Sequence, residues 1–231
     1  MRPALVAIDG PAASGKSTLG YRLAQKWGYL FFDTGVLYRV VSLAALERGV
    51  SIDDEVGLTE LAEGIDIDVT PPTQDDGRFN TVLLDGRDVT WDIRTPAVDA
   101  IVSPVSAVRG VRRALVEQQR RIGRRGRVIM VGRDIGTVVL PEADLKLFVE
   151  ASLEVRARRR FLEAQARGER VTFEHVVDEM RRRDERDRAK PISPLVAAPD
   201  AVVLDTTALD VDGVVAQVEA MLGRRSEETA I

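Results

Sequence analysis

The sequence contains no cysteine and a single histidine, His175. Without cysteine there is neither a disulfide framework nor a thiolate metal site, and a reducing compartment is expected. With one histidine, interpreted as a surface residue, Ser–His and Cys–His nucleophile schemes and zinc sites are excluded as well. Any catalysis must therefore rest on other groups.

Long apolar runs are also missing. No stretch approaches the 18 apolar residues of a membrane span, and the N-terminus lacks the apolar segment of a signal peptide. We therefore expect a cytoplasmic protein that does not bind membranes. With 231 residues, 45% of them apolar, the chain can form one well-buried domain with inserted lobes.

The net charge of −4 is small, but the charges are segregated. Residues 109–190 carry 22 Lys and Arg against 14 Asp and Glu, and the remainder carries 11 against 23. A basic sector in an acidic chain suits a polyanionic ligand, although solvated helices with i,i+4 ion pairs explain many of these arginines. Little aromatic interleaving and no nucleic-acid module argue against a nucleic-acid partner.

One stretch matches G-x-x-x-x-G-K-[ST], the phosphate-binding loop of nucleoside triphosphate enzymes. It follows an apolar strand at 4–8 and precedes a helical pattern at 16–27, so backbone N–H groups converge on one point. Lys16 is expected to reach the β- and γ-phosphates of ATP, and the Ser17 hydroxyl to bind Mg²⁺. The loop consists of Gly10, Pro11, Ala12, Ala13, Ser14, Gly15, Lys16, Ser17 and Thr18.

Strand and helix patterns alternate along the chain, which predicts an α/β fold. Short apolar strands are expected near 4–8, 29–33, 127–131, 145–149 and 201–205. Helices are expected near 16–27, 35–48, 54–63, 96–103, 106–124, 152–167, 172–188 and 210–222.

Residues 65–92 depart from this pattern. Their alternating apolar and polar residues and their Gly turns predict a small antiparallel sheet inserted into the core. Two Arg-rich helices within 151–190, joined by Gly168, are typical of a lid that binds phosphate, or of a solvated helix pair. The polar tail 224–231 is expected to fray.

Other candidate site residues follow predicted strands or lie on predicted helices. Asp33 and Thr34 follow the second strand, and Arg133 and Asp134 follow the third, where open α/β sheets bind ligands. One of the first two also suits a helix cap. Ser103 with the arginines at 109, 112 and 113 is a weaker signal that also fits a solvated helix face.

The order of these motifs closely resembles bacterial cytidylate (CMP) kinases over nearly the whole chain. The segments that carry the resemblance are Gly10–Thr18, Asp33-Thr34-Gly35-x-x-Tyr38-Arg39, Ile93-Arg94-Thr95, Gly132-Arg133-Asp134-Ile135-Gly136-Thr137-Val138-Val139, Arg183-Asp184-x-x-Asp187 and Ser193-Pro194-Leu195. Thr34 and Lys190 stand where Ser and Arg are usual.

The resemblance implies a role for each site residue. Cytosine would be surrounded by Thr34, Arg112, Asp134 and Lys190, the sugar held by Ser103, Arg183 and Asp187, and the CMP phosphate bound by Arg39 and Arg133. On the donor side, Arg159 would join the phosphate loop at ATP. Lys16, Arg133, Asp134 and Arg183 would form the catalytic group, with Asp134 as the reader of the base or an outer-sphere partner of Mg²⁺.

The implied fold is one P-loop kinase domain, a three-layer α/β fold with a five-stranded parallel sheet. Its core would comprise 1–64, 93–150 and 191–223, with a monophosphate-binding insert at 65–92 and a lid at 151–190. The implied reaction transfers the γ-phosphoryl group of ATP to CMP or dCMP in a monomer with Mg²⁺. A kinase of another acceptor such as UMP, and a nucleotide-binding regulator, remain the alternatives.

Overall fold

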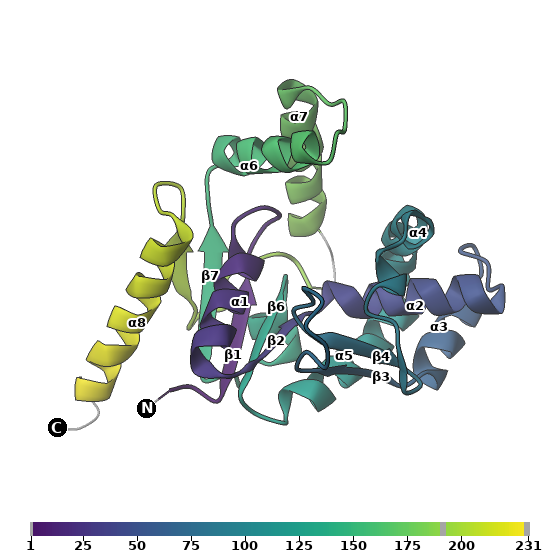
Figure 1. Cartoon of the computed structure of the whole chain (residues 1–231), viewed down its shortest axis with the longest axis horizontal. Coiled ribbons are helices and arrows are strands. Elements are labelled where there is room, and N and C mark those ends of the chain that lie inside the picture. The colour runs from purple at the N-terminus through teal and green to yellow at the C-terminus, as the bar shows by residue number, and fades with distance from the viewer. Residues whose placement is uncertain (1, 190–192, 229–231) are drawn as a thin grey trace. The chain divides into compact units, whose positions relative to one another are not determined.

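In the computed structural model, which describes residues 2–189 and 193–228, strands and helices alternate as the sequence predicts. Five short apolar strands form a parallel sheet in the order β2-β6-β1-β7-β8 (Figure 1). They are β1 (Leu5–Asp9), β2 (Leu30–Asp33), β6 (Val128–Gly132), β7 (Leu145–Glu150) and β8 (Val202–Asp205). Nearly continuous apolar runs are expected in a sheet covered on both faces. The predicted α/β fold class is confirmed.

The chain packs as two compact units. The first comprises the chain up to Tyr29 and from Ile129 onward, and the second comprises Leu30–Val128. Helices of the first unit are α1 (Lys16–Trp27), α6 (Leu153–Ala166), α7 (Phe173–Arg188), α8 (Val211–Glu228) and the π-helix Ile135–Val139. Helices of the second are α2 (Gly35–Arg48), α3 (Glu55–Gly64), α4 (Pro96–Ala107), α5 (Arg109–Gly123) and the 3₁₀ turn Asp92–Arg94.

In the second unit, a small antiparallel sheet forms within residues 65–92, as expected. It consists of β3 (Ile67–Thr70), β4 (Thr81–Leu84) and β5 (Arg87–Asp88), in that order. Strands β3 and β4 pair with Ile67 opposite Leu84 and Thr70 opposite Thr81. The alternation of Ile67 and Val69 with polar residues buries one face, which fixes this register.

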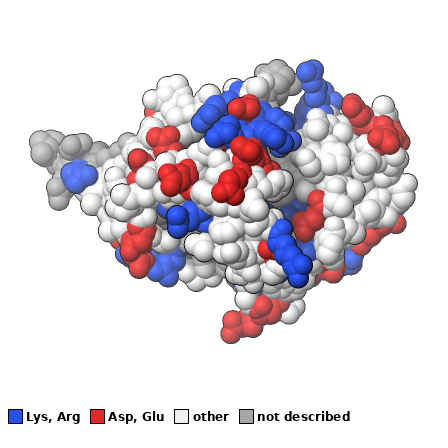
Figure 2. Space-filling model, turned by 90° about the horizontal axis from the view of Figure 1, so that it is seen from above, with Lys and Arg blue, Asp and Glu red and all other residues white. Residues whose placement is uncertain are grey.

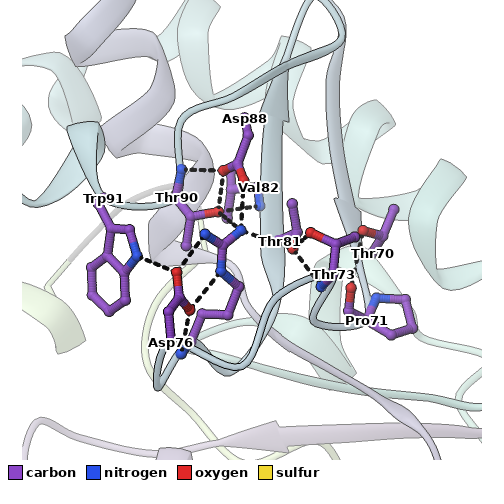
Figure 3. Close-up of polar contacts among 10 residues, drawn as sticks. Thr70, Pro71, Thr73, Asp76, Thr81, Val82, Asp88, Thr90 and Trp91 are labelled. Carbon is purple, nitrogen blue, oxygen red and sulfur yellow. Dashed lines mark hydrogen bonds and ion pairs between the residues drawn. The ribbon is translucent and has the colours of Figure 1, made fainter.

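The loop between β3 and β4 is held by polar side chains (Figure 3). The buried Arg78 guanidinium donates to both carboxylate oxygens of Asp76, at 2.8 and 2.6 Å, and to Asp88. It also donates to the Thr81 hydroxyl at 3.2 Å, and the Trp91 ring nitrogen donates to Asp76 at 2.9 Å. The Arg78 guanidinium holds the pKa of the Asp76 carboxyl well below its usual range.

Helices α4 and α5 meet near residue 108, a few residues after the expected boundary, and two further local features differ from the sequence-based expectation. Helix α8 continues to Glu228, past its expected end near 222, because the polar residues after Leu222 are mostly good helix formers. A π-helix at Ile135–Val139 was not expected, since its apolar sequence gives no distinctive signal. No helix within the described ranges has the length and apolar character that a membrane crossing requires.

Candidate functional site

The phosphate loop joins β1 to α1 with the backbone turns that its small residues permit. Ala13 has φ 58° and Gly15 has φ 88°, both in the left-handed region. A Cβ on Gly10 would lie 2.0 Å from the carbonyl oxygen of Val149, so only glycine fits there. Alternating backbone conformations of this kind turn successive N–H groups toward one point and create an anion-binding concavity.

Side chains fix the carbonyl oxygens of this loop. Lys16 Nζ donates to Pro11 O at 3.0 Å. Two arginines of α6 hold the next two carbonyls: Arg156 Nη1 donates to Ala12 O at 3.3 Å, and Arg159 Nη1 donates to Ala13 O at 3.4 Å. The Thr206 hydroxyl donates to the following carbonyl, Ser14 O, at 3.0 Å. Because a trans peptide is planar, a fixed carbonyl directs the following N–H to the opposite side. The N–H groups of residues 13, 14 and 15 are therefore oriented away from these partners.

The loop fits a bound triphosphate in two further respects. The Ser14 hydroxyl is fully buried and has no hydrogen-bond partner among the described residues, so it is available to an oxygen-rich ligand. Lys16 is buried and holds its ammonium group at the loop through Pro11 O. In the part of the chain that the structure describes, no cluster of three or more His, Asp or Glu side chains could hold a metal.

Asp9, at the end of β1, organises the segment that follows β6. Its buried carboxylate accepts from the N–H groups of Ile135 and Gly136, both at 2.8 Å. Burial raises the pKa of the Asp9 carboxyl to about 6; those two N–H groups oppose the shift, and the negative charge of Asp134 adds to it. Asp9 thereby fixes the backbone directly after Asp134, which is itself buried.

In the same unit, three of the predicted substrate-binding residues lie together. Arg133 Nε donates to Asp187 Oδ2 at 3.3 Å, and the Asp187 side chain is only 10% exposed. Burial, and then the positive charge of Arg133, lower the pKa of the Arg183 guanidinium, whereas Asp187 opposes this shift. Two guanidinium groups thus share a neighbourhood with one carboxylate, which favours an additional anion.

The second unit gathers another set of predicted residues. Arg39, on α2, donates to Asp99 of α4 at 2.6 Å and to Ile93 O at 3.0 Å. Ser103 lies one helical turn beyond Asp99 on α4, and Arg112 of α5 donates to the Tyr38 hydroxyl at 3.4 Å.

Two further observations concern this set. Burial, and then the charge of Arg39, lower the pKa of Arg94, so a second pair of guanidinium groups is crowded here. Thr34 precedes α2 and is buried, but its side chain forms no cap hydrogen bond. The Asp33 carboxylate accepts from Gly35 N–H at 3.0 Å instead.

Some arginines of the predicted lid lie in surface ion pairs. On α6 and α7, Arg160 pairs with Glu163 at 3.4 Å and Arg181 with Asp178 at 3.1 Å, all four side chains being more than half exposed. Figure 2 shows one face of the molecule, on which Lys and Arg side chains gather with Asp and Glu beside them. Such pairs contribute little to stability. The alternative of solvated helix faces therefore accounts for these arginines, but not for Arg156 or Arg159.

Three residues at the site were missed by the sequence analysis as candidates: Asp9, Thr206 and Asp184, the buried partner of Arg156. Asp9 and Thr206 could have been identified from the sequence, because each lies at the carboxyl end of a core strand, where open α/β sheets bind ligands. The pairing of Arg156 with Asp184 has no such signal, since neighbours along one helix do not reveal a partner on another. Lys190 lies outside the described residues.

Fold and loop together define a P-loop α/β domain built to hold a nucleotide phosphate chain. Comparison with solved structures supports this fold. A shikimate kinase of Bacteroides thetaiotaomicron matches with a TM-score of 0.50 at 13% identity, covering 94% of this chain and 97% of that one. An uncharacterised protein of Eubacterium ventriosum matches with a TM-score of 0.52 at 10% identity, over 94% and 97%.

Sequence comparison identifies the family. The cytidylate kinase family model matches residues 6–223. A cytidylate kinase of Chloroflexus aggregans is 53% identical over 87% of this chain and 86% of its own length. One of Carboxydothermus hydrogenoformans is 47% identical over 96% and 98%. The chain belongs to the cytidylate kinase family, and the resemblance predicted from the sequence is confirmed.

Proposed function

We propose that the protein is a (d)CMP kinase, which transfers the γ-phosphoryl group of ATP to CMP or dCMP and yields ADP and CDP or dCDP. The observation that carries this proposal is the phosphate loop, with its carbonyls fixed by Lys16, Arg156, Arg159 and Thr206, in a member of the cytidylate kinase family. A loop held in this way is preorganised for a polyanion before any ligand arrives.

On the donor side, residues 10–18 would hold the triphosphate. The Lys16 ammonium group would exchange Pro11 O for phosphate oxygens, and the Ser17 hydroxyl would hold Mg²⁺, which neutralises charge between the phosphates. Arg159 already donates to Ala13 O and to Thr206 O, at 3.4 and 2.9 Å, so it is anchored beside the loop. We assign it to the donor nucleotide.

On the acceptor side, we assign Arg39 and Arg133 to the CMP phosphate, and Ser103, Arg183 and Asp187 to the sugar. Thr34, Arg112, Asp134 and Lys190 are assigned to cytosine. The crowding of Arg133 with Arg183, and of Arg39 with Arg94, supports anion binding at both places. Arg133 would leave its partner Asp187 for the phosphate, and a sugar hydroxyl would then donate to the Asp187 carboxylate.

This reaction requires no histidine base. The acceptor is a phosphate monoester with a second pKa of about 6, so at neutral pH it is already a dianionic nucleophile. The protein has instead to align two polyanions and to stabilise the charge on the phosphoryl group in transit. The positive charge for this stabilisation would come from Lys16, Arg133 and Arg183. Side chains on a solvated surface could not hold these charges in such fixed positions.

A coupled assay of ADP release tests the proposal. With ATP and Mg²⁺, we expect turnover with CMP and dCMP, and much slower turnover with UMP, AMP and GMP. Efficient turnover with UMP alone would favour the neighbouring kinase activity. Slow ATP hydrolysis that does not depend on any acceptor would favour a nucleotide-binding regulator and contradict the proposal.

Several finer assignments stay predictions. We propose a monomer that acts in the cytoplasm on small-molecule substrates and does not bind nucleic acid. Sedimentation analysis with and without CMP should show a single species with the mass of a monomer. A dimer in either condition would contradict this assignment. The division into a core, an insert at 65–92 and a lid at 151–190 also stays a prediction, and limited proteolysis at the insert and lid boundaries would test it.

A further inference from the structure

One buried guanidinium group joins three segments of the first unit. Arg156, on α6, binds Asp184 of α7 through two hydrogen bonds, Nη1–Oδ1 at 3.2 Å and Nη2–Oδ2 at 2.6 Å. Its Nε donates to Ala151 O at 2.9 Å, and its Nη1 to Ala12 O in the phosphate loop at 3.3 Å. The side chains of Arg156 and Asp184 are 4% and 8% exposed. A single side chain therefore connects the phosphate loop with α7.

Apolar packing reinforces this connection. Ala157 of α6 and Val176 and Met180 of α7 form a buried cluster, against which Ala12 and Ala13 of the phosphate loop pack. Since both loop residues pack against this cluster, a ligand that shifts the loop even slightly would act on the packing between α6 and α7.

Helix α7 also carries residues assigned to the acceptor. Asp184 is adjacent to Arg183, and Asp187 follows one turn later on the same face, where it pairs with Arg133. Two ion pairs thus fix the orientation of α7: the first involves Asp184 and reaches the phosphate loop, and the second involves Asp187 and reaches the end of β6.

Stability alone does not explain why charges occupy this place. A buried ion pair is often no more stabilising than apolar residues of similar volume, and the same two helices already pack through an apolar cluster. What an apolar pair would lack is the hydrogen bond from Arg156 to Ala12 O, which makes the α6–α7 pairing sensitive to the loop conformation.

We propose that Arg156 and Asp184 are a positioning pair that couples donor binding at the phosphate loop to the orientation of Arg183 and Asp187. ATP and CMP would then bind synergistically, each raising the affinity for the other by the same factor. The proposal rests on the acceptor roles assigned to Arg183 and Asp187 above.

The test is the affinity for CMP, measured by calorimetry with and without a saturating, non-hydrolysable ATP analogue and Mg²⁺. For the wild type we expect the analogue to raise CMP affinity about 5-fold or more, within the usual range of coupling between sites. In Asp184→Asn we expect the factor to fall below about 2-fold, because the bridge from the phosphate loop through Arg156 to α7 is weakened. Asp178→Asn, which removes an exposed ion pair of the same helix, should retain the wild-type factor.

A second variant covers the case in which Asp184→Asn leaves Arg156 unpaired and does not fold. Arg156→Met combined with Asp184→Leu removes both charges and should fold, yet it should lose the coupling. Wild-type coupling in either variant, or no coupling in a wild type that turns over CMP, would overturn the proposal. Absence of CMP turnover in the wild type would instead contradict the proposed function.

Discussion

Two buried arginines, one in each unit, illustrate how similar chemistry serves different ends. Arg78 and Arg156 have side chains that are 3% and 4% exposed, and each binds an aspartate through two hydrogen bonds. The partners of Arg78 all lie between Asp76 and Thr90 and are side chains only. The partners of Arg156 range from Ala12 to Asp184 and include two main-chain carbonyls.

This difference has a functional meaning. A network confined to 15 neighbouring residues, such as that of Arg78, stabilises the small sheet in which it lies. A network that reaches the phosphate loop, such as that of Arg156, holds the main chain of that loop. We therefore expect changes around the phosphate loop to appear in kinetics and binding, and changes around Arg78 to appear in stability.

The largest effect is expected at the phosphate loop itself. Lys16→Ala removes the ammonium group that compensates phosphate charge, and kcat should fall by about 10³-fold or more. Far-UV circular dichroism and Tm should stay close to wild-type values, because the loop carbonyls of Ala12, Ala13 and Ser14 keep their own hydrogen-bond partners in this variant. Normal turnover by the folded variant would contradict the assignment of the donor site.

A pH-dependent effect on stability is expected at Asp9. Its pKa is about 6 in the folded protein against 3.8 in an unfolded chain, so between these values the folded state binds more protons. The free energy of unfolding therefore falls as pH rises through this window, by about 3 kcal/mol for a shift of about two units.

Asp9→Asn cannot ionise and should lack this decline, so the stability of the variant relative to wild type should rise from pH 4 to above pH 6. Urea unfolding of both proteins at several pH values measures this difference in the free energy of unfolding. Asp200→Asn is the matched control, because the Lys146 ammonium group lowers the pKa of the Asp200 carboxyl. The pH dependence of its relative stability should have the opposite sign, and the same sign in both variants would refute the assignment at Asp9.

A smaller effect concerns base choice. Cytosine carries an amino donor where uracil carries a carbonyl, and a carboxylate can accept only from the former. If Asp134 reads this position, Asp134→Ala should lower the ratio of kcat/KM for CMP over UMP by roughly 10- to 100-fold. An equal loss with both substrates, with an unchanged ratio, would favour the role as an outer-sphere partner of Mg²⁺.

The effect expected at Arg78 is confined to stability. Arg78→Lys keeps one positive charge but cannot bridge Asp76 and Asp88, and Tm should fall by roughly 5–10 °C. The affinity for an ATP analogue should remain at the wild-type value. A marked loss of analogue affinity without a change in Tm would erase the distinction between the two arginines.

Much of the fold follows from local sequence patterns. Helices α1 and α2 begin and end at the residues that the pattern predicts, because Gly15, Gly28 and Gly49 adopt the left-handed conformation at their ends. The five core strands are short apolar runs, and the phosphate loop has a motif of fixed spacing. These features depend on neighbours along the chain, which a single sequence displays.

The remainder depends on contacts between distant segments. The capping of Ile135 and Gly136 by Asp9 joins residues more than 120 positions apart, and the hydrogen bond from Thr206 to Ser14 O joins residues 192 apart. Among the arginines of α6, only topology decides that Arg156 turns inward while Arg160 pairs at the surface. The composition of α6 and the spacing of its arginines do not distinguish a buried arginine from an exposed one.

The most direct test of the distinction between the two buried arginines compares Arg156→Lys with Arg78→Lys in one experiment. The measured quantity is the factor by which a saturating ATP analogue with Mg²⁺ raises the affinity for CMP. We predict that Arg156→Lys, which keeps the charge but loses the planar fork, brings this factor close to one, whereas Arg78→Lys retains the wild-type factor despite its lower Tm. An unchanged factor in Arg156→Lys, or an equal loss in both variants, would contradict the account.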